Sequence, residues 1–324
     1  MLKHFKEFNP ILITTEETKN IFSKVDYILP GFKNSFDFIT KSGPFYRKCK
    51  RLLKDLNAQF PKLVIYCPSF HPWNYLIGKL AKRLKIKFAI TVHDYKLHQS
   101  ERKFVRLLQN KTIALSNPCV FLTDHQMNLA AKAGFNKTIF MVLPHPLFTE
   151  VNSNNKPYNP LPNLLFVGYI KPYKGLELLS SALEELSFNK LTIAGDGELP
   201  KINLPNLNII NRKISDDELN TLIENHEFLI LPYTQASQSG VLCLGLSKEI
   251  NMIITEHPGL QEQLAPDCAY WSKPSKESLN QTLKSAFTNE LLYYQKKKNL
   301  AQEKRAYSKS WNHSFNTLIG KLLE

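Results

Sequence analysis

The chain has 324 residues, of which 43% are hydrophobic and 22% are charged, a balance that is typical of a globular protein and excludes a disordered chain. Because single hydrophobic cores stop growing at about 250 to 300 residues, this length favours two domains over one. The formal net charge of +14 attracts anionic partners such as phosphate groups, nucleic acid or acidic lipid headgroups, and does not distinguish between them.

In the first half of the chain, short apolar runs alternate with segments whose apolar residues recur at helical spacing. Alternating strands and helices are typical of an α/β domain with a parallel sheet. We expect a helix over Gly43–Leu56 and strands at Pro10–Thr14, Lys62–Tyr66, Lys87–Val92, Cys119–Leu122 and Ile139–Leu143. Together they predict an N-terminal α/β domain at residues 1–150.

A polar segment follows this domain. Between Glu150 and Pro162 the chain is rich in Asn and Pro and poor in apolar residues, which is typical of a turn-rich connection. We therefore predict a linker at residues 151–162.

The second half repeats the alternation of strands and helices. After Ser275 the pattern is helical, and an amphipathic helix is predicted around Trp311–Leu323. We therefore expect a second domain at 163–305 and a C-terminal helix at 306–324 that crosses back to the first domain. The predicted strands of the second domain are Leu164–Gly168, Leu191–Gly195, Leu207–Ile210, Phe228–Pro232, Met252–Thr255 and Cys268–Tyr270.

Ligands bind open parallel sheets beyond the carboxyl ends of the strands, so the strand-to-helix turns are the places to search. The turn after the first strand of the second domain carries Lys171 and Lys174 where a helix begins. Unpaired N–H groups at a helix N-terminus, together with an ammonium group, can hold a pyrophosphate. A solvated pair of surface lysines is the alternative.

Two further turns suit an anion. Ser239 is a preferred N-cap residue, and Gly240 beside it lets a ligand approach the backbone amides. Gly195, Asp196 and Gly197 form a glycine-flanked turn after another predicted strand. The alternatives are an ordinary helix cap and a tight turn that needs positive φ.

These turns belong to a series of motifs that occur in a specific order along the chain. Leu-Phe-Val-Gly-Tyr-Ile-Lys-Pro-Tyr-Lys-Gly, Ile-Ala-Gly-Asp-Gly-Glu, Ile-Ser-Asp-Asp-Glu-Leu, Leu-Pro-Tyr, Gln-Ser-Gly-Val and Pro-Gly-Leu-Gln-Glu follow one another between Asn163 and Glu262. This series closely resembles the donor domain of the group 1, family 4-like retaining glycosyltransferases, in the branch with Gln-Ser-Gly-Val. The resemblance implies an α/β fold of the GT-B type, in which two Rossmann-like, doubly wound parallel-sheet domains face each other across a cleft.

The resemblance also implies roles for particular residues. Lys174 would clamp the donor diphosphate, and the helix that starts at Ser239 would present amides to phosphate and sugar. His93, just past the predicted strand Lys87–Val92, would contact the donor sugar. The implied catalytic residues are His93 and Lys174, and the implied donor-binding residues are Gly168, Lys171, Lys174, Gly195, Asp196, Gly197, Arg212, Ser237, Ser239, Gly240 and Val241.

Several positions depart from the family pattern. Tyr169 stands where the family usually has an arginine, so Lys171 is expected to supply the second positive charge. Ser237 and Gly245 stand where many members carry two glutamates, which leaves ribose recognition unassigned. The family's opening strand and glycine-rich acceptor loop are not evident before Pro10.

Other residues of the first domain lie at the same predicted rim. Asp94 and His98 either accompany His93 in the site or cap its loop. Trp73 follows the predicted strand Lys62–Tyr66 and either stacks on a sugar ring or belongs to the core.

The predicted helix Gly43–Leu56 places basic residues beside apolar residues at helical spacing. Such a helix can lie on an anionic membrane surface, and a solvated surface helix is the alternative. We therefore expect peripheral membrane association and a lipid-linked acceptor. The basic residues concerned are Arg47, Lys48, Lys50, Arg51 and Lys54.

The five cysteines are scattered, without the pairs that would predict a zinc site or a disulfide framework. The N-terminal residues lack a signal-peptide pattern, and no run of about 18 apolar residues occurs. We expect a cytoplasmic protein, peripheral on the inner membrane face, with no metal or cofactor. The sequence shows no nucleic-acid-binding motif, and the absence of GxGxxG after a strand argues against a dehydrogenase.

These patterns together predict transfer of a hexose from a GDP- or UDP-sugar to a glycan or lipid-linked acceptor, with retention, in surface polysaccharide synthesis. The alternative is a non-catalytic scaffold protein that keeps the sugar-nucleotide fold, as the missing first strand and glutamate pair suggest.

Overall fold

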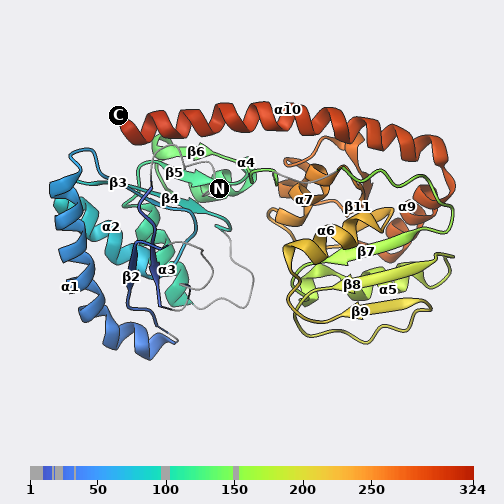
Figure 1. Ribbon diagram of the computed structural model, residues 1–324, viewed down its shortest axis with the longest axis horizontal. Helices are drawn as coiled ribbons and strands as arrows, with labels where there is room; N and C mark the ends of the chain where they lie inside the picture. The colour runs from blue at the N-terminus through green and yellow to red at the C-terminus, as the bar shows by residue number, and fades with distance from the viewer. Residues whose placement is uncertain (1–9, 17, 19–24, 33, 96–102, 149–152) are drawn as a thin grey trace. The chain divides into compact units, whose positions relative to one another are not determined.

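The computed structural model describes residues 10–16, 18, 25–32, 34–95, 103–148 and 153–324. The chain divides into two compact units (Figure 1). Unit 1 contains the chain up to residue 122 together with residues 127–143 and 315–324, and unit 2 contains residues 123–126 and 144–314. No helix in the described ranges is long and apolar enough to span a membrane.

Unit 1 is an α/β unit whose main sheet has four parallel strands in the order β3-β4-β5-β6. Two further strands, β1 and β2, form a separate parallel pair. The sequence predicted five of these six strands, but not β2. The elements are β1 (Ile13–Thr15), β2 (Tyr27–Leu29), α1 (Ser35–Gln59), β3 (Val64–Cys67), α2 (Trp73–Leu84), β4 (Lys87–Val92), α3 (Lys103–Ile113), β5 (Cys119–Phe121), α4 (Asp124–Lys132), η3 (Lys137–Ile139) and β6 (Phe140–Val142).

Helix α1 begins eight residues before the predicted start at Gly43. Asn34 caps the helix, because its side-chain oxygen accepts a hydrogen bond from the Asp37 amide at 2.9 Å. In the first turn Phe38 stacks on Trp73, with ring centroids 4.5 Å apart. This packing holds the added turns in place, and the helix continues through Pro44.

Unit 2 contains a six-stranded parallel sheet with the order β12-β11-β10-β7-β8-β9, of which Figure 1 labels β7, β8, β9 and β11. The order reverses between β7 and β10, as in a doubly wound sheet. Strands β10 and β11 are buried along their whole length, which agrees with their continuous apolar runs. The elements are β7 (Asn163–Val167), η4 (Pro172–Lys174), α5 (Leu176–Leu183), β8 (Lys190–Ala194), β9 (Leu207–Ile210), α6 (Asp216–Glu224), β10 (Phe228–Leu231), α7 (Gly240–Lys248), β11 (Asn251–Thr255), α8 (Pro258–Gln261), η5 (Pro266–Cys268), β12 (Tyr270–Ser272), α9 (Lys276–Thr288) and α10 (Glu290–Leu323).

Two predictions at the C-terminal end need correction. The last strand starts at Tyr270, and Cys268 instead ends the short helix η5. The predicted boundary at residue 305 falls inside α10, a single helix of 34 residues. Between Glu290 and Ile319 the sequence offers no Gly or Pro to stop a helix, so α10 runs on, and its residues 315–324 group with unit 1.

The described part of the predicted linker, residues 153–162, forms no regular element but is anchored on unit 2. The buried Asn154 side chain donates hydrogen bonds to the Ile223 and His226 carbonyls at 2.7 and 3.0 Å. The Lys297 ammonium donates to Asn154 Oδ1 at 3.0 Å. Residues 149–152 lie outside the described part of the chain.

Candidate functional site

The sequence-predicted donor residues of unit 2 lie in the turns at the carboxyl ends of four neighbouring strands. Gly168 and Lys174 follow β7, Gly195 follows β8, Arg212 follows β9, and Ser239 follows β10. The strand order reverses between β7 and β10, which is where doubly wound sheets bind their ligands. The sheet thus gathers residues that are far apart in the sequence.

Glycine lets these turns touch through their backbones. Gly195 has a φ of +155°, and a Cβ atom there would lie 1.8 Å from the Gly168 carbonyl oxygen. Gly197, at φ +146°, would bring a Cβ atom within 2.1 Å of the Ile170 carbonyl oxygen. A side chain would force these turns apart, so both glycines set the shape of the site.

Lys174 lies against an aromatic ring. Its ammonium nitrogen is 3.8 Å from the centroid of the Tyr233 ring, a cation–π geometry worth about 0.5 to 2 kcal/mol. Tyr233 is only 1% exposed, and its burial raises the pKa of the phenol to about 12. The ring is therefore a neutral, rigid platform that fixes where the lysine charge lies.

The same tyrosine connects Lys174 to the start of α7. Its hydroxyl is 3.3 Å from Ser239 Oγ, and Ser239 Oγ accepts a hydrogen bond from the Leu242 amide at 3.2 Å. Ser239 is thus the N-cap predicted from the sequence. The loop after β7 also reaches this helix, because a Cβ atom on Gly168 would lie 3.6 Å from the Val241 side chain.

One backbone N–H group at the start of α7 already donates a hydrogen bond inside the protein. The Ser239 amide donates to Gln263 Oε1 at 2.7 Å, so it already has a partner within unit 2. The amides of Gly240 and Val241, in the first turn of α7, have no partner within the helix. They carry the positive end of the helix dipole, so this turn can still bind phosphate.

Replacing Ser239 by Ala should lower the free energy of unfolding by about 1 kcal/mol, because the α7 N-cap is lost. Urea denaturation measures this change. Ser275, which caps α9 in the same way, provides a matched control whose Ala variant should be destabilised equally. Weaker nucleotide binding is expected only for Ser239→Ala. Equal nucleotide binding by the two variants would contradict the assignment of the α7 N-terminus as a phosphate-binding site.

The remaining predicted donor residues differ in their surroundings. Lys171 is exposed at the N-cap of η4, and Asp196 is exposed after β8. Ser237 is half-buried, and its carbonyl oxygen would lie 1.8 Å from a Cβ atom on Gly259. Arg212 follows β9, at the edge of the sheet.

The Arg212 side chain is engaged within unit 2. Two of its guanidinium nitrogens donate to the Glu218 carboxylate, each at 2.7 Å. These hydrogen bonds lower the pKa of Glu218 and raise that of Arg212. The structure therefore shows Arg212 in an exposed ion pair at the start of α6, rather than directed at the turns that hold Lys174 and Ser239.

Sequence reasoning did not assign three residues that organise this site. Tyr233 holds Lys174, Gln263 accepts the Ser239 amide, and His257 Nε2 lies 2.9 Å from the Tyr233 carbonyl oxygen. Tyr233 and Gln263 lie in or beside the Leu-Pro-Tyr and Pro-Gly-Leu-Gln-Glu strings. Those two motifs could have pointed to Tyr233 and Gln263, but a motif does not show which residues these side chains contact.

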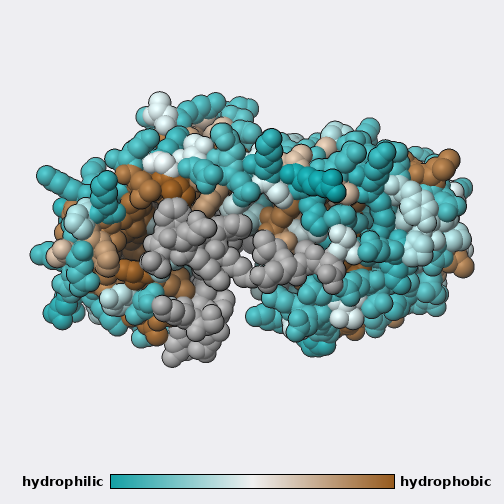
Figure 2. All heavy atoms as spheres, turned by 45° about the horizontal axis from the view of Figure 1, so that its top comes forward, coloured by the Kyte–Doolittle hydropathy of each residue, from teal (hydrophilic) through white to brown (hydrophobic). Residues whose placement is uncertain are grey.

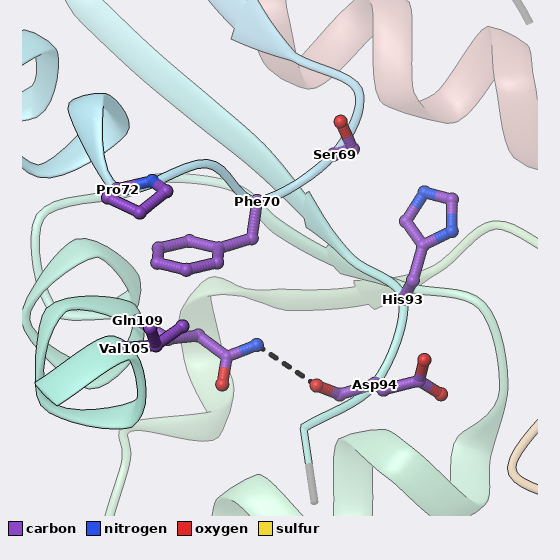
Figure 3. Close-up of a pocket in the computed structure, with 7 residues that line it drawn as sticks. All are labelled: Ser69, Phe70, Pro72, His93, Asp94, Val105 and Gln109. Carbon is purple, nitrogen blue, oxygen red and sulfur yellow. Dashed lines mark hydrogen bonds between the residues drawn. The ribbon is translucent and has the colours of Figure 1, made fainter. Parts of the chain in front are cut away.

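Unit 1 contains a pocket of about 260 Å³ at the ends of β3 and β4 (Figure 3). His93 lines it, and His93 Nε2 lies 2.9 Å from the Pro68 carbonyl oxygen. The Gln109 amide donates to the Asp94 carbonyl at 2.9 Å, which joins α3 to the end of β4. The lining residues are Ser69, Phe70, Pro72, His93, Asp94, Val105 and Gln109.

Two other predictions for unit 1 have different outcomes. Trp73 is 1% exposed and stacks on Phe45, with ring centroids 4.2 Å apart, so it belongs to the core and cannot stack on a sugar. His98 lies outside the described residues.

Within the described ranges, no group of three or more His, Cys, Asp or Glu side chains is arranged to hold a metal ion.

Comparison with known proteins gives one sequence relative and many similar structures. No protein-family model matches the chain. A stretch of 106 residues is 31% identical to an uncharacterised glycosyltransferase of Methanocaldococcus jannaschii, which corresponds to 30% of each protein. The chain thus matches less than a third of the length of this curated relative.

The structural matches extend over nearly the whole chain. The Anabaena protein HepE in complex with UDP-glucose has a TM-score of 0.74 at 9% identity, with 95% of this chain and 91% of that chain covered. A glycosyltransferase from Rickettsia africae has a TM-score of 0.70 at 14% identity, with 99% and 91% covered. Sucrose-phosphate synthase from Thermosynechococcus elongatus has a TM-score of 0.65 at 13% identity, with 89% and 81% covered.

These similarities show the fold. The chain is an α/β protein of the GT-B type, with two Rossmann-like units, which confirms the fold class expected from the order of motifs.

Proposed function

We propose that this protein is a glycosyltransferase that moves a hexose from a nucleotide diphosphate sugar to a glycan or lipid-linked acceptor, with retention. The observation that carries the proposal is the Lys174 ammonium, fixed on the Tyr233 ring beside the first turn of α7. The names of the sequence relative and of the similar structures support the same class of reaction. Surface polysaccharide synthesis in the cytoplasm is the proposed setting.

The chemistry of the site suits a diphosphate leaving group. Breaking the bond between sugar and diphosphate leaves negative charge on the phosphate oxygens, and groups fixed to receive that charge stabilise the transition state. Lys174 and the amides of Gly240 and Val241 are such groups, and Lys171, four residues before Gly175 in the same turn, adds a second positive charge. With these charges, no metal ion is needed to neutralise the diphosphate, so we propose transfer that survives chelation by EDTA.

The pocket of unit 1 is the proposed acceptor site, and His93 on its wall is proposed to contact the donor sugar. Its polar lining residues include Ser69, His93 and Asp94. Polar groups of this kind bind and orient a sugar hydroxyl. The remaining lining is largely apolar, as in most small-molecule pockets.

A thermal-shift assay with UDP, GDP and their glucose and mannose conjugates tests donor binding. A ligand at 100 times its Kd should add about 2.7 kcal/mol to the free energy of unfolding. UDP-glucose is the first donor to test, because HepE was crystallised with it. No stabilisation by any of these nucleotides would contradict the proposed donor site.

A non-catalytic scaffold protein is the second candidate, favoured by the missing glutamate pair at Ser237 and Gly245. Nucleotide stabilisation without donor hydrolysis or sugar transfer would support it. Product formation from a labelled donor would instead support the glycosyltransferase.

A further inference from the structure

Helix α1 exposes one face along most of its length. The exposed positions 36, 40, 43, 47, 51 and 54 follow one another at intervals of three or four residues, which places them on one side of a helix. At the N-terminal end this face carries Phe36, which is 74% exposed, and its neighbour Ile39, which is 68% exposed. We call these two residues the apolar tip.

The second half of the same face is strongly basic. All five of its basic side chains are exposed. None of them forms a salt bridge with another residue in the part of the chain that the structure describes. The basic face, as we call it, consists of Arg47, Lys48, Lys50, Arg51 and Lys54.

The opposite side of α1 is part of the core of unit 1. Phe45, Cys49 and Leu53 are at most 3% exposed, and they pack in one cluster with Trp73 and Leu80. The apolar residues that suggested an amphipathic membrane helix are therefore already buried in the protein. Contact with a membrane would have to use the exposed face instead.

We propose that the apolar tip and basic face of α1 together dock on an anionic lipid bilayer. Lysine and arginine near such a surface are attracted to its phosphate groups, and exposed Phe and Ile side chains enter the headgroup region. Nucleic acid would satisfy the basic face but not the apolar tip, so the pairing of the two favours a bilayer. In Figure 2 hydrophobic surface is visible over unit 1, whereas the visible surface of unit 2 is mostly hydrophilic.

Vesicle co-sedimentation of the full chain tests this proposal without any sugar substrate, so its outcome is independent of the proposed sugar transfer. We expect binding to phosphatidylcholine vesicles that contain phosphatidylglycerol, weaker binding at high salt, and little binding to pure phosphatidylcholine. The triple variant Arg47→Gln, Lys48→Gln, Arg51→Gln should lose about 100-fold in partition coefficient, because each basic residue contributes about fivefold. The double variant Phe36→Ser, Ile39→Ser should lose about tenfold or more.

Matched controls come from unit 2. The variant Lys201→Gln, Lys284→Gln, Lys298→Gln removes the same charge from exposed residues, and Leu291→Ser removes an apolar side chain that is 86% exposed. Both should bind as the unmodified protein does, and circular dichroism should show every variant folded. Equal losses in the control and α1 variants, no binding to anionic vesicles, or unchanged binding of the Phe36→Ser, Ile39→Ser variant would overturn the proposal.

Discussion

Replacing Lys174 by Ala should lower kcat/KM for sugar transfer by about 100- to 1,000-fold, the usual cost of removing one group that stabilises transition-state charge. The reason is geometric, since the Tyr233 ring holds the Lys174 ammonium 3.8 Å from its centroid, beside the start of α7. Steady-state kinetics with a labelled nucleotide sugar measures the effect. Most of the loss should appear in kcat, because the diphosphate gains charge as the bond breaks.

Two further variants separate this role from a general loss of positive charge. Lys201→Ala removes an exposed lysine of the same unit and should leave kcat/KM unchanged. Tyr233→Phe keeps the ring under Lys174 and removes only the hydroxyl that meets Ser239, so it should retain most of the activity. Near-normal sugar transfer by the Lys174→Ala variant would refute the assignment of Lys174 as the residue that stabilises charge on the diphosphate.

Replacing Gly175 by Ala should destabilise the protein by about 3 to 5 kcal/mol, because it combines backbone strain with a steric clash. Gly175 has a φ of +72°, and a Cβ atom there would lie 1.8 Å from the Pro232 carbonyl oxygen. The turn that carries Lys174 would have to move away from the loop after β10. Urea denaturation measures the loss in the free energy of unfolding.

Gly320 provides the control for this substitution. It lies in α10, where an added Cβ atom would meet nothing within 4 Å and φ is not positive. Gly320→Ala should therefore stabilise the protein by up to about 1 kcal/mol, because Ala has the higher helix propensity. A Gly175→Ala variant as stable as the unmodified protein would show that the two turns can separate without cost.

Most strands could be predicted from the sequence because burial on both faces demands continuous apolar runs. Phe228–Leu231 is such a run, and Met252–Ile254 forms the apolar centre of β11; both strands begin within one residue of their predicted positions. The start of α1 lies eight residues before its predicted position. Gly43 and Pro44 are local helix breakers, yet α1 passes through them, since its first turns are held by Phe38 on Trp73.

In the candidate site, too, some features could be predicted from the sequence and others only from the fold. The sequence by itself determined that Lys174 and Ser239 lie where the chain passes from a strand to a helix, because strand, turn and N-cap signals are local. Only the tertiary structure decided what these residues meet: the Tyr233 ring lies under Lys174, and Gln263 takes the Ser239 amide. These partners are distant in the sequence and become neighbours because parallel strands end at one edge of the sheet, which no local pattern encodes.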